Sequence, residues 1–153
     1  RVGEGPFVTE FDSELNECIR TKGHEFGSTT GRPRRCGWFD AVQVRYAAII
    51  NGVSELAIMK LDVMDDLKEV KIATSYTYKG KKFTEFPHDY DALTKAKPVY
   101  ETMPGWQADT RKVRKYKDLP PQARKYLERL EALLKVKIKY ISVGSKRDEI
   151  IVR

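Results

Sequence analysis

The 153-residue sequence has few residues of the kinds that bind transition metals or form cross-links, with two cysteines and two histidines. Cys18 and Cys36 are too far apart for the short ligand spacings of a zinc site, and two cysteines are too few for a disulfide scaffold. His24 and His88 each stand without a nearby Cys or His. We therefore expect reduced thiols, a cytoplasmic location and no metal ligand set in these residues.

The sequence also lacks a long apolar run and a glycine-rich phosphate loop. No uninterrupted apolar segment approaches the roughly 20 residues that span a bilayer, and residues 1–6 do not resemble a signal peptide. No Gly-x-x-x-x-Gly-Lys-Ser/Thr pattern is present. Position 1 is arginine rather than an initiating methionine, so we expect the chain to begin inside a longer product. These absences argue against a membrane protein and against a self-contained phosphate-binding domain.

The composition is that of a soluble globular domain, with 41% hydrophobic and 33% charged residues. The net charge of +7 is uneven, because residues 1–75 hold 10 Lys and Arg against 12 Asp and Glu, whereas residues 76–153 hold 19 against 10. A basic run at 111–117 contributes to this excess. Such a run can bind nucleic acid, but a solvated lysine-rich face is commoner, and we favour that interpretation.

The segment from Glu25 to Asp40 is the most distinctive part of the sequence. It reads EFGSTTGRPRRCGWFD, with arginines at 32, 34 and 35 beside two threonines and three glycines. Pro33 prevents a helix here, and in an extended backbone Arg32 and Arg34 point the same way. Arginine donates two parallel hydrogen bonds to a carboxylate or phosphate. The segment therefore predicts an anion-binding loop, although a solvated basic turn would have a similar charge.

Two further segments indicate a purine site. The apolar run from Leu56 ends in Lys60 and Asp62, which would lie on one face of a strand. An aspartate carboxylate can accept from both N1–H and the exocyclic amine of guanine, while a lysine stem can cover the ring. Ser142 and the Gly144 amide follow another predicted strand and could meet the O6 edge of a purine, although a plain hairpin turn would look similar.

The periodicity of the sequence predicts an α/β fold with mainly parallel strands, flanking helices and an antiparallel hairpin at 70–86. In the first helix we expect Phe11, Leu15, Cys18 and Ile19 on the apolar face. In the last helix we expect a Glu131–Lys135 ion pair. The expected helices are 10–22, 38–50 and 119–134, and the expected strands are 56–62, 70–78, 83–86, 98–106, 136–142 and 149–152.

The Glu25–Asp40 segment closely resembles the substrate loop of adenylosuccinate synthetase. The resemblance extends, in consistent order and spacing, to four other segments: Val2–Phe7, Lys60–Asp62, Tyr100–Trp106 and Ser142–Gly144. It implies that residues 1–153 are the carboxyl-terminal portion of a larger P-loop-related, GTP-dependent ligase fold. The departures are Val8 and Ser145, where proline is usual, and Met59, where Asn or Thr precedes lysine in related base-recognition elements.

This resemblance also implies the chemistry. The family joins IMP and L-aspartate to form adenylosuccinate in AMP biosynthesis, uses GTP and Mg²⁺, and is homodimeric. Arg34 would have a catalytic role near the GTP phosphates. The residues implied for aspartate and IMP are Val2, Ser28, Thr29, Thr30, Gly31, Arg32, Pro33 and Arg34. The residues implied for GTP are Arg34, Lys60, Leu61, Asp62, Ser142, Val143 and Gly144.

The same resemblance implies what these residues do not supply. The family's phosphate loop, catalytic aspartate, general-acid histidine and Mg²⁺ ligands have no counterpart in this sequence, so we expect the chain to be inactive alone. A non-catalytic guanine-nucleotide-binding domain is one alternative, and a basic nucleic-acid-binding module is another.

Overall fold

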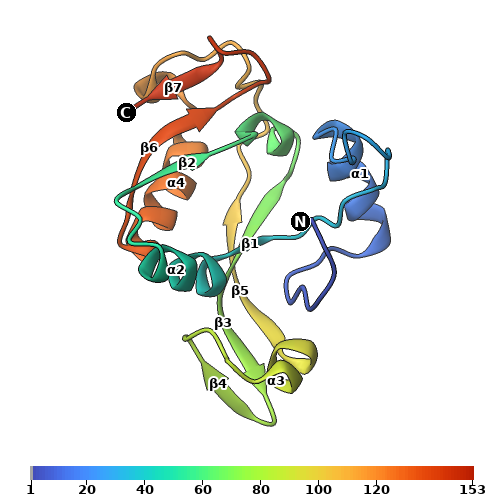
Figure 1. Cartoon of the computed structure of the whole chain (residues 1–153). Helices are drawn as coiled ribbons and strands as arrows, with labels where there is room; N and C mark the ends of the chain where they lie inside the picture. Colours follow the sequence, from blue (N-terminus) through green and yellow to red (C-terminus); the bar gives the residue numbers. More distant parts are fainter. Residues whose placement is uncertain (1) are drawn as a thin grey trace. The chain divides into compact units, whose positions relative to one another are not determined.

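The computed structural model describes residues 2–153, which form two compact units. Unit 1 comprises Arg1–Val42 and Lys71–Glu101, and unit 2 comprises Gln43–Val70 and Thr102–Arg153. Helices and strands alternate along the chain, which confirms the α/β class, and each unit contains both parallel and antiparallel strand pairs (Figure 1). No helix in residues 2–153 is long and apolar enough to cross a bilayer.

Unit 1 is built on a sheet in which β3 pairs with three other strands. β1 runs parallel to β3, with Phe39 opposite Ile72, and β4 runs antiparallel to it. The hairpin turns at Lys79 and Gly80, which both have positive φ, so β4 ends sooner than the sequence predicts. The elements are α1 (Ser13–Lys22), β1 (Phe39–Asp40), β3 (Glu69–Tyr78), β4 (Lys81–Phe83), α3 (Tyr90–Lys95) and β5 (Lys97–Pro104), of which β3 begins and β5 ends in unit 2.

The centre of this sheet is more buried than its sequence suggests. The alternation of tyrosine and threonine in β3 is typical of a half-exposed edge, yet Tyr76 is completely buried. Its hydroxyl donates to the buried Asp40 carboxylate at 2.5 Å, and its ring meets Phe83 edge-on. Burial, followed by the hydrogen bond to Asp40, raises the pKa of Tyr76. The carboxylate therefore supplies the partner that this tyrosine needs in the core.

Helix α1 has a half-buried apolar face and a buried polar residue. Asp12 caps the helix by accepting from the Leu15 amide at 3.0 Å, and Gly23 ends it as predicted. The prediction that Cys18 is a packing residue is wrong, because Cys18 is exposed and Asn16 is buried instead. The side chain of Asn16 serves the loop that follows α1, as described below.

Unit 2 has a second sheet in the order β2-β6-β7. β2 runs parallel to β6, with Ile58 opposite Ile141, and β7 returns antiparallel to β6. The elements are α2 (Ala41–Ile50, beginning in unit 1), β2 (Glu55–Ile58), the 3-10 helices η1 (Leu61–Met64) and η2 (Tyr116–Asp118), α4 (Pro121–Leu134), β6 (Lys137–Ser142) and β7 (Ile150–Val152).

Helix α4 begins at Pro121, two residues after the predicted start, and ends at Leu134 as predicted. Its buried residues are Ala123, Tyr126, Leu127, Leu130 and Leu134. The predicted Glu131–Lys135 pair is wrong. Glu131 instead accepts from Arg153 at 2.6 Å and from the Ile138 amide at 2.7 Å. In α2, Ile49 and Ile50 follow the predicted period but are 73% and 61% exposed.

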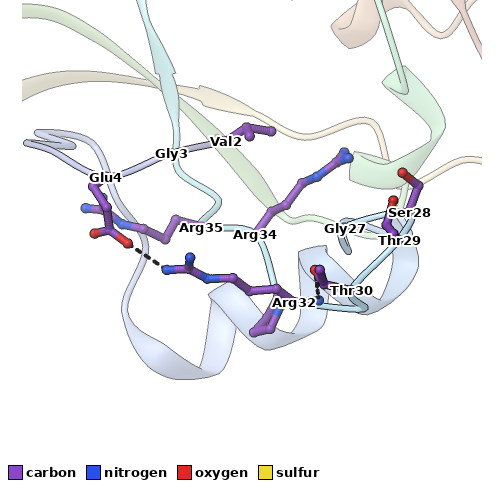
Figure 2. Close-up of a pocket in the computed structure, with 11 residues that line it drawn as sticks. Val2, Gly3, Glu4, Gly27, Ser28, Thr29, Thr30, Arg32, Arg34 and Arg35 are labelled. Carbon is purple, nitrogen blue, oxygen red and sulfur yellow. Dashed lines mark hydrogen bonds and ion pairs between the residues drawn. The ribbon is translucent and has the colours of Figure 1, made fainter.

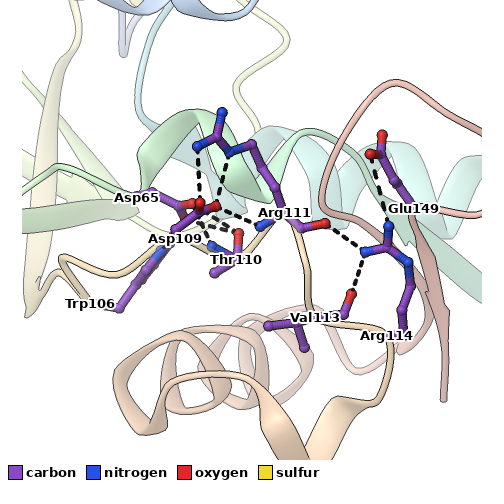
Figure 3. A network of polar contacts seen from close by, with 8 residues as sticks. All are labelled: Asp65, Trp106, Asp109, Thr110, Arg111, Val113, Arg114 and Glu149. Atoms are coloured by element: carbon purple, nitrogen blue, oxygen red, sulfur yellow. Dashed lines mark hydrogen bonds and ion pairs between the residues drawn. The ribbon is translucent and has the colours of Figure 1, made fainter.

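A buried aspartate joins two distant segments of unit 2 (Figure 3). Asp65 accepts from the Trp106 indole at 2.6 Å, from the Thr110 amide at 2.7 Å and from the Thr110 hydroxyl at 2.9 Å. Gly105 permits this arrangement because a Cβ there would lie 1.8 Å from the Leu67 carbonyl oxygen. The Pro104-Gly105 segment is therefore a close backbone approach that places Trp106 against Asp65.

We expect Asp65→Asn to destabilise the protein by about 3 kcal/mol, because an amide cannot accept all of these bonds and leaves buried donors unpaired. Urea unfolding followed by Trp fluorescence measures the change. The neighbouring Asp66 is exposed, so Asp66→Asn is the matched control and should stay within about 0.5 kcal/mol of wild type. Equal effects of the two substitutions would contradict the role given to Asp65.

Candidate functional site

The arginine-rich segment of unit 1 folds as a closed, two-armed loop. Its arms are joined by hydrogen bonds from the Gly27 amide to the Arg32 carbonyl at 2.8 Å and from the Arg34 amide to the Glu25 carbonyl at 2.9 Å. Phe26 and Pro33 form an antiparallel bridge between them. The extended backbone predicted around Pro33 is therefore confirmed.

This loop and the start of the chain line one pocket of about 410 Å³ (Figure 2). The pocket brings together every residue expected for aspartate and IMP except Gly31, which makes the turn with φ 64°. Thr30 supports that turn, since its hydroxyl oxygen accepts from the Arg32 amide at 3.3 Å. The residues that line the pocket are Val2, Gly3, Glu4, Gly27, Ser28, Thr29, Thr30, Arg32, Pro33, Arg34 and Arg35.

The two predicted arginines differ in how much of their donor capacity is used. Arg32 is exposed, and its Nη2 lies 2.6 Å from a Glu4 carboxylate oxygen that is also exposed. Arg34 is half-buried, and its Nη1 donates to Glu25 at 2.9 Å. The Nε of Arg34 is buried without a hydrogen-bond partner in the described residues. A buried N–H without an acceptor is costly, so an anion in this pocket would satisfy it.

Arg35 also lines the pocket, but the sequence did not single it out as a ligand-binding residue. Its guanidinium donates to both Glu10 carboxylate oxygens, at 2.8 and 2.6 Å, and to the Gly5 carbonyl at 2.8 Å. The hydrogen bond to Glu10 raises the pKa of Arg35. Arg35 therefore fastens the first residues of the chain to the loop.

Helix α1 supports the loop through two side chains that the sequence did not reveal. Arg20 Nε donates to the Arg34 carbonyl at 2.9 Å, and Arg20 Nη2 donates to the Asn16 side-chain oxygen at 3.0 Å. The same oxygen accepts from the Cys36 amide at 3.1 Å. An asparagine inside an amphipathic helix was the one available signal, because a buried amide needs partners outside its own helix.

The predicted guanine residues gather at one edge of the sheet in unit 2. The parallel pair of β2 and β6 ends with Ile58 opposite Ile141, so Lys60–Asp62 and Ser142–Gly144 leave the sheet at the same edge. Ligands of α/β sheets bind beyond this end of parallel strands. The expectation that Lys60 and Asp62 share a face of a strand is wrong, because Lys60 has a left-handed backbone and Asp62 lies in η1.

One carboxylate oxygen of Asp62 lacks a hydrogen-bond donor among the described residues. Its Oδ1 is buried and makes no hydrogen bond in the described residues. Burial raises the pKa of Asp62, the nearby Asp65 and Glu149 carboxylates add to this, and Arg111 acts against it. A ligand that presents N–H groups would stabilise the charged carboxylate.

The β6 side of this edge is organised by its own hydrogen bonds. The Ser142 hydroxyl donates to the Gly144 carbonyl at 2.7 Å, and the Val143 amide donates to the Glu149 carbonyl at 2.9 Å. A hydroxyl has one proton to donate. Ser142 can therefore donate to a purine O6 only by releasing Gly144, whereas the Gly144 amide requires no such exchange.

The described residues do not form a metal site. No group of three or more His, Cys, Asp or Glu side chains in residues 2–153 is placed to hold a metal ion. Of the residues predicted for GTP, Arg34 lies in unit 1 with the arginine loop, whereas Lys60–Asp62 and Ser142–Gly144 lie in unit 2.

Comparison with known proteins identifies the family of the chain. Residues 1–151 match the family model described as adenylosuccinate synthetase. Curated adenylosuccinate synthetases from Desulforamulus reducens and Carboxydothermus hydrogenoformans are 55% and 53% identical over 99% of this chain, which covers 36% of each relative. The chain thus spans about a third of the length of these relatives.

A solved structure leads to the same family. It is fully ligated adenylosuccinate synthetase from Plasmodium falciparum, with a TM-score of 0.95 and 36% identity, and it covers 100% of this chain, which corresponds to 37% of that one. The family pattern matches residues 1–151, and a relative shares more than half of the aligned residues. On these grounds the chain belongs to the adenylosuccinate synthetase family.

Proposed function

We propose that residues 1–153 are the carboxyl-terminal portion of an adenylosuccinate synthetase and supply its aspartate loop and guanine subsite. The complete enzyme would join IMP to L-aspartate at the expense of GTP. The observation that carries this proposal is the single pocket that gathers Val2 with the Ser28–Arg34 loop. Membership of the family supports it. As the resemblance implies, we expect that enzyme to be a cytoplasmic homodimer.

The arginine loop suits a dicarboxylate that attacks a phosphorylated purine. Arg32 is placed to bind an aspartate carboxylate with two parallel hydrogen bonds. Arg34 keeps a buried donor free of any partner in residues 2–153, and a fixed guanidinium can neutralise charge that develops during phosphoryl transfer. Serine and threonine hydroxyls at 28–30 complete the set of donors. Together these groups would bind and orient aspartate and exclude the water that surrounds it in solution.

The Asp62 edge suits guanine rather than adenine. Guanine presents N1–H and an exocyclic amine, which one carboxylate can accept together, and it presents O6 to the Gly144 amide. Adenine has an acceptor at N1 and an amine at position 6, so it would leave both Asp62 and Gly144 without complementary partners. Lys60 directly precedes η1, and its aliphatic stem would cover the base.

Magnesium would be held outside these residues. Bound Mg²⁺ neutralises the phosphate oxygens of GTP during transfer. Residues 2–153 offer no carboxylate cluster for it, so we assign no step of this chain to the metal. The contribution of the chain is to bind and orient aspartate and the guanine base.

Neither alternative function accounts for both subsites. A nucleic-acid module would use the cations of the 111–117 run, of which Arg111 holds Asp109 through two bonds of 2.9 Å and Arg114 donates to the Arg111 carbonyl at 2.6 Å (Figure 3). The lysines of the run are exposed, but neither the arginine loop nor the Asp62 edge belongs to it. A guanine-binding domain without catalysis would have no use for Arg32 and Arg34 in a separate pocket.

We expect the chain to bind GDP in preference to ADP, and Asp62→Asn to transfer that preference to XDP. Asparagine can donate to the 2-oxo group of xanthine, whereas aspartate cannot. Ligand-observed NMR with GDP, ADP and XDP side by side measures the preference, with Asp66→Asn as the control. An Asp62→Asn variant that still prefers GDP would contradict the guanine assignment.

We expect Arg32→Leu to raise the KM for aspartate by about 30-fold or more, because it removes charge-assisted hydrogen bonds worth roughly 2 kcal/mol. The test uses a complete enzyme in which this chain replaces the matching third of the D. reducens relative. Arg32→Lys keeps the charge but not the fork of donors, so its KM should be intermediate. Lys125→Leu, an exposed position on α4, is the control. An unchanged KM in Arg32→Leu would exclude Arg32 from the aspartate site.

We expect the affinity for GDP to fall as the pH is lowered. The fall should begin at a higher pH than it would if Asp62 had the pKa of an ordinary aspartate. The carboxylate form of Asp62 accepts from guanine, and the raised pKa of Asp62 means that it is protonated above the ordinary value of 3.8. The sign for folding is opposite, because the folded protein retains a proton that the unfolded chain releases, so Asp62 lowers stability as the pH rises through this window. The measurement is the affinity of wild type for GDP and of Asp62→Asn for XDP at several pH values. Only the affinity of wild type for GDP should depend on the protonation of Asp62.

A further inference from the structure

We infer that Glu149 is a positioning residue for the guanine subsite, which holds the Ser142–Gly144 segment in place and adds negative charge near Asp62. The inference rests on the proposed function, because it concerns the same base. Glu149 follows the segment by five positions in the sequence and does not itself belong to the predicted site. Its contacts, its packing and its charge each support the assignment.

The contacts close a compact loop from Val143 to Glu149. The Glu149 amide donates to the Lys146 carbonyl at 3.0 Å, and the Lys146 amide donates to the Glu149 carboxylate at 2.8 Å. The Glu149 carbonyl accepts from the Val143 amide at 2.9 Å. One residue therefore makes three of the hydrogen bonds that set this loop.

The side chain of Glu149 packs directly on Gly144. A Cβ added to Gly144 would lie 2.3 Å from the Glu149 Oε2 and 2.6 Å from its Cδ, although Gly144 does not have a positive φ. The glycine is therefore needed for space rather than for backbone freedom. Because the carboxylate lies against the Gly144 backbone, its position limits where the Gly144 amide can point.

The Glu149 carboxylate is itself held by Arg114. Its side chain is 17% exposed, and Arg114 Nη2 lies 3.9 Å from Oε1. Arg114 cannot swing away freely, because its Nη1 donates to the carbonyls of Arg111 and Val113 at 2.6 and 3.0 Å (Figure 3). Glu149 thus links the 111–114 segment to the loop that carries the Gly144 amide.

The charge of Glu149 acts on Asp62. After burial and the neighbouring Asp65, Glu149 contributes to the raised pKa of Asp62, and Arg111 opposes it. Two carboxylates near one edge make a ligand with N–H donors favourable there and a ligand with a second oxo group unfavourable. Shape at Gly144 and charge near Asp62 would therefore both favour guanine.

The test compares Glu149→Ala and Glu149→Gln in the 153-residue chain, with Asp148→Asn as the control. Asp148 is the adjacent carboxylate, lies at the same 3.9 Å from Arg114 and is 77% exposed. The readouts are amide hydrogen exchange at Lys146 and Val143, the pKa of the Asp62 carboxyl by NMR, and GDP affinity.

We expect Glu149→Ala to speed exchange at Lys146 and to weaken GDP binding, each by about tenfold, the effect of one lost hydrogen bond. Glutamine keeps an acceptor but not the charge, so Glu149→Gln should stay within about threefold of wild type in exchange while lowering the pKa of Asp62 as alanine does. Asp148→Asn should leave Lys146 exchange and GDP affinity unchanged.

The outcomes separate this inference from the function on which it rests. A wild-type chain that prefers GDP, with the same affinity in Glu149→Ala, would overturn the positioning role alone. A wild-type chain with no preference among nucleotides would overturn the guanine subsite, and the role of Glu149 for guanine with it, even if Lys146 exchange showed that the loop depends on Glu149. Should Glu149→Ala fail to fold, Glu149→Gln decides the charge component, and an unshifted Asp62 pKa would refute it.

Discussion

The structure depends on charges that are compensated within the chain before any ligand arrives. In unit 1 each arginine of the loop faces a carboxylate, with Arg32 on Glu4 and Arg34 on Glu25. In unit 2 the compensated charge is negative, because the buried Asp65 carboxylate accepts hydrogen bonds from Trp106 and Thr110. Buried ions without partners are costly. Asp62 and Arg34 are among the charged residues that depart from this rule, since each has one polar side-chain atom that is buried without a hydrogen bond in the described residues. A group that departs from the rule in this way is a strong candidate for a ligand contact.

The sequence was sufficient to predict the helices and strands in which buried apolar residues recur at a regular spacing. Helix α4 lies within the predicted range 119–134, and its buried residues recur at helical spacing. The prediction for α1 was wrong at Cys18, because the helix is held through Asn16, and a polar anchor leaves no periodic signal. The burial of Tyr76 was equally hidden, since its partner Asp40 lies in another strand far away in the sequence. Long-range polar pairs are visible only when the topology is known.

The candidate site, too, could be predicted from the sequence only in part. The composition of the arginine loop predicted an extended anion-binding loop, and the backbone bonds across it agree. The strand conformation expected for Lys60 and Asp62 was wrong, because β2 ends at Ile58 and the chain turns through a left-handed residue. Their proximity to the end of β6 follows from strand register, which a sequence without its pairing partner does not specify. Arg35 was missed as a pocket residue because its role is to hold Glu10 and Gly5.

The exposed pair of Arg32 and Glu4 has a consequence for how the loop exchanges partners. Both side chains are mostly in water, at 74% and 82% exposure, so the pair contributes at most about 1 kcal/mol. Glu4 nevertheless stays near Arg32 because Arg35 fastens the neighbouring Gly5 to the loop, which gives its carboxylate a fixed effective concentration. An incoming carboxylate therefore competes with one that is already tethered. The protein thereby presents Arg32 in a binding orientation, and the competition with Glu4 lowers the affinity of an incoming anion by no more than about fivefold.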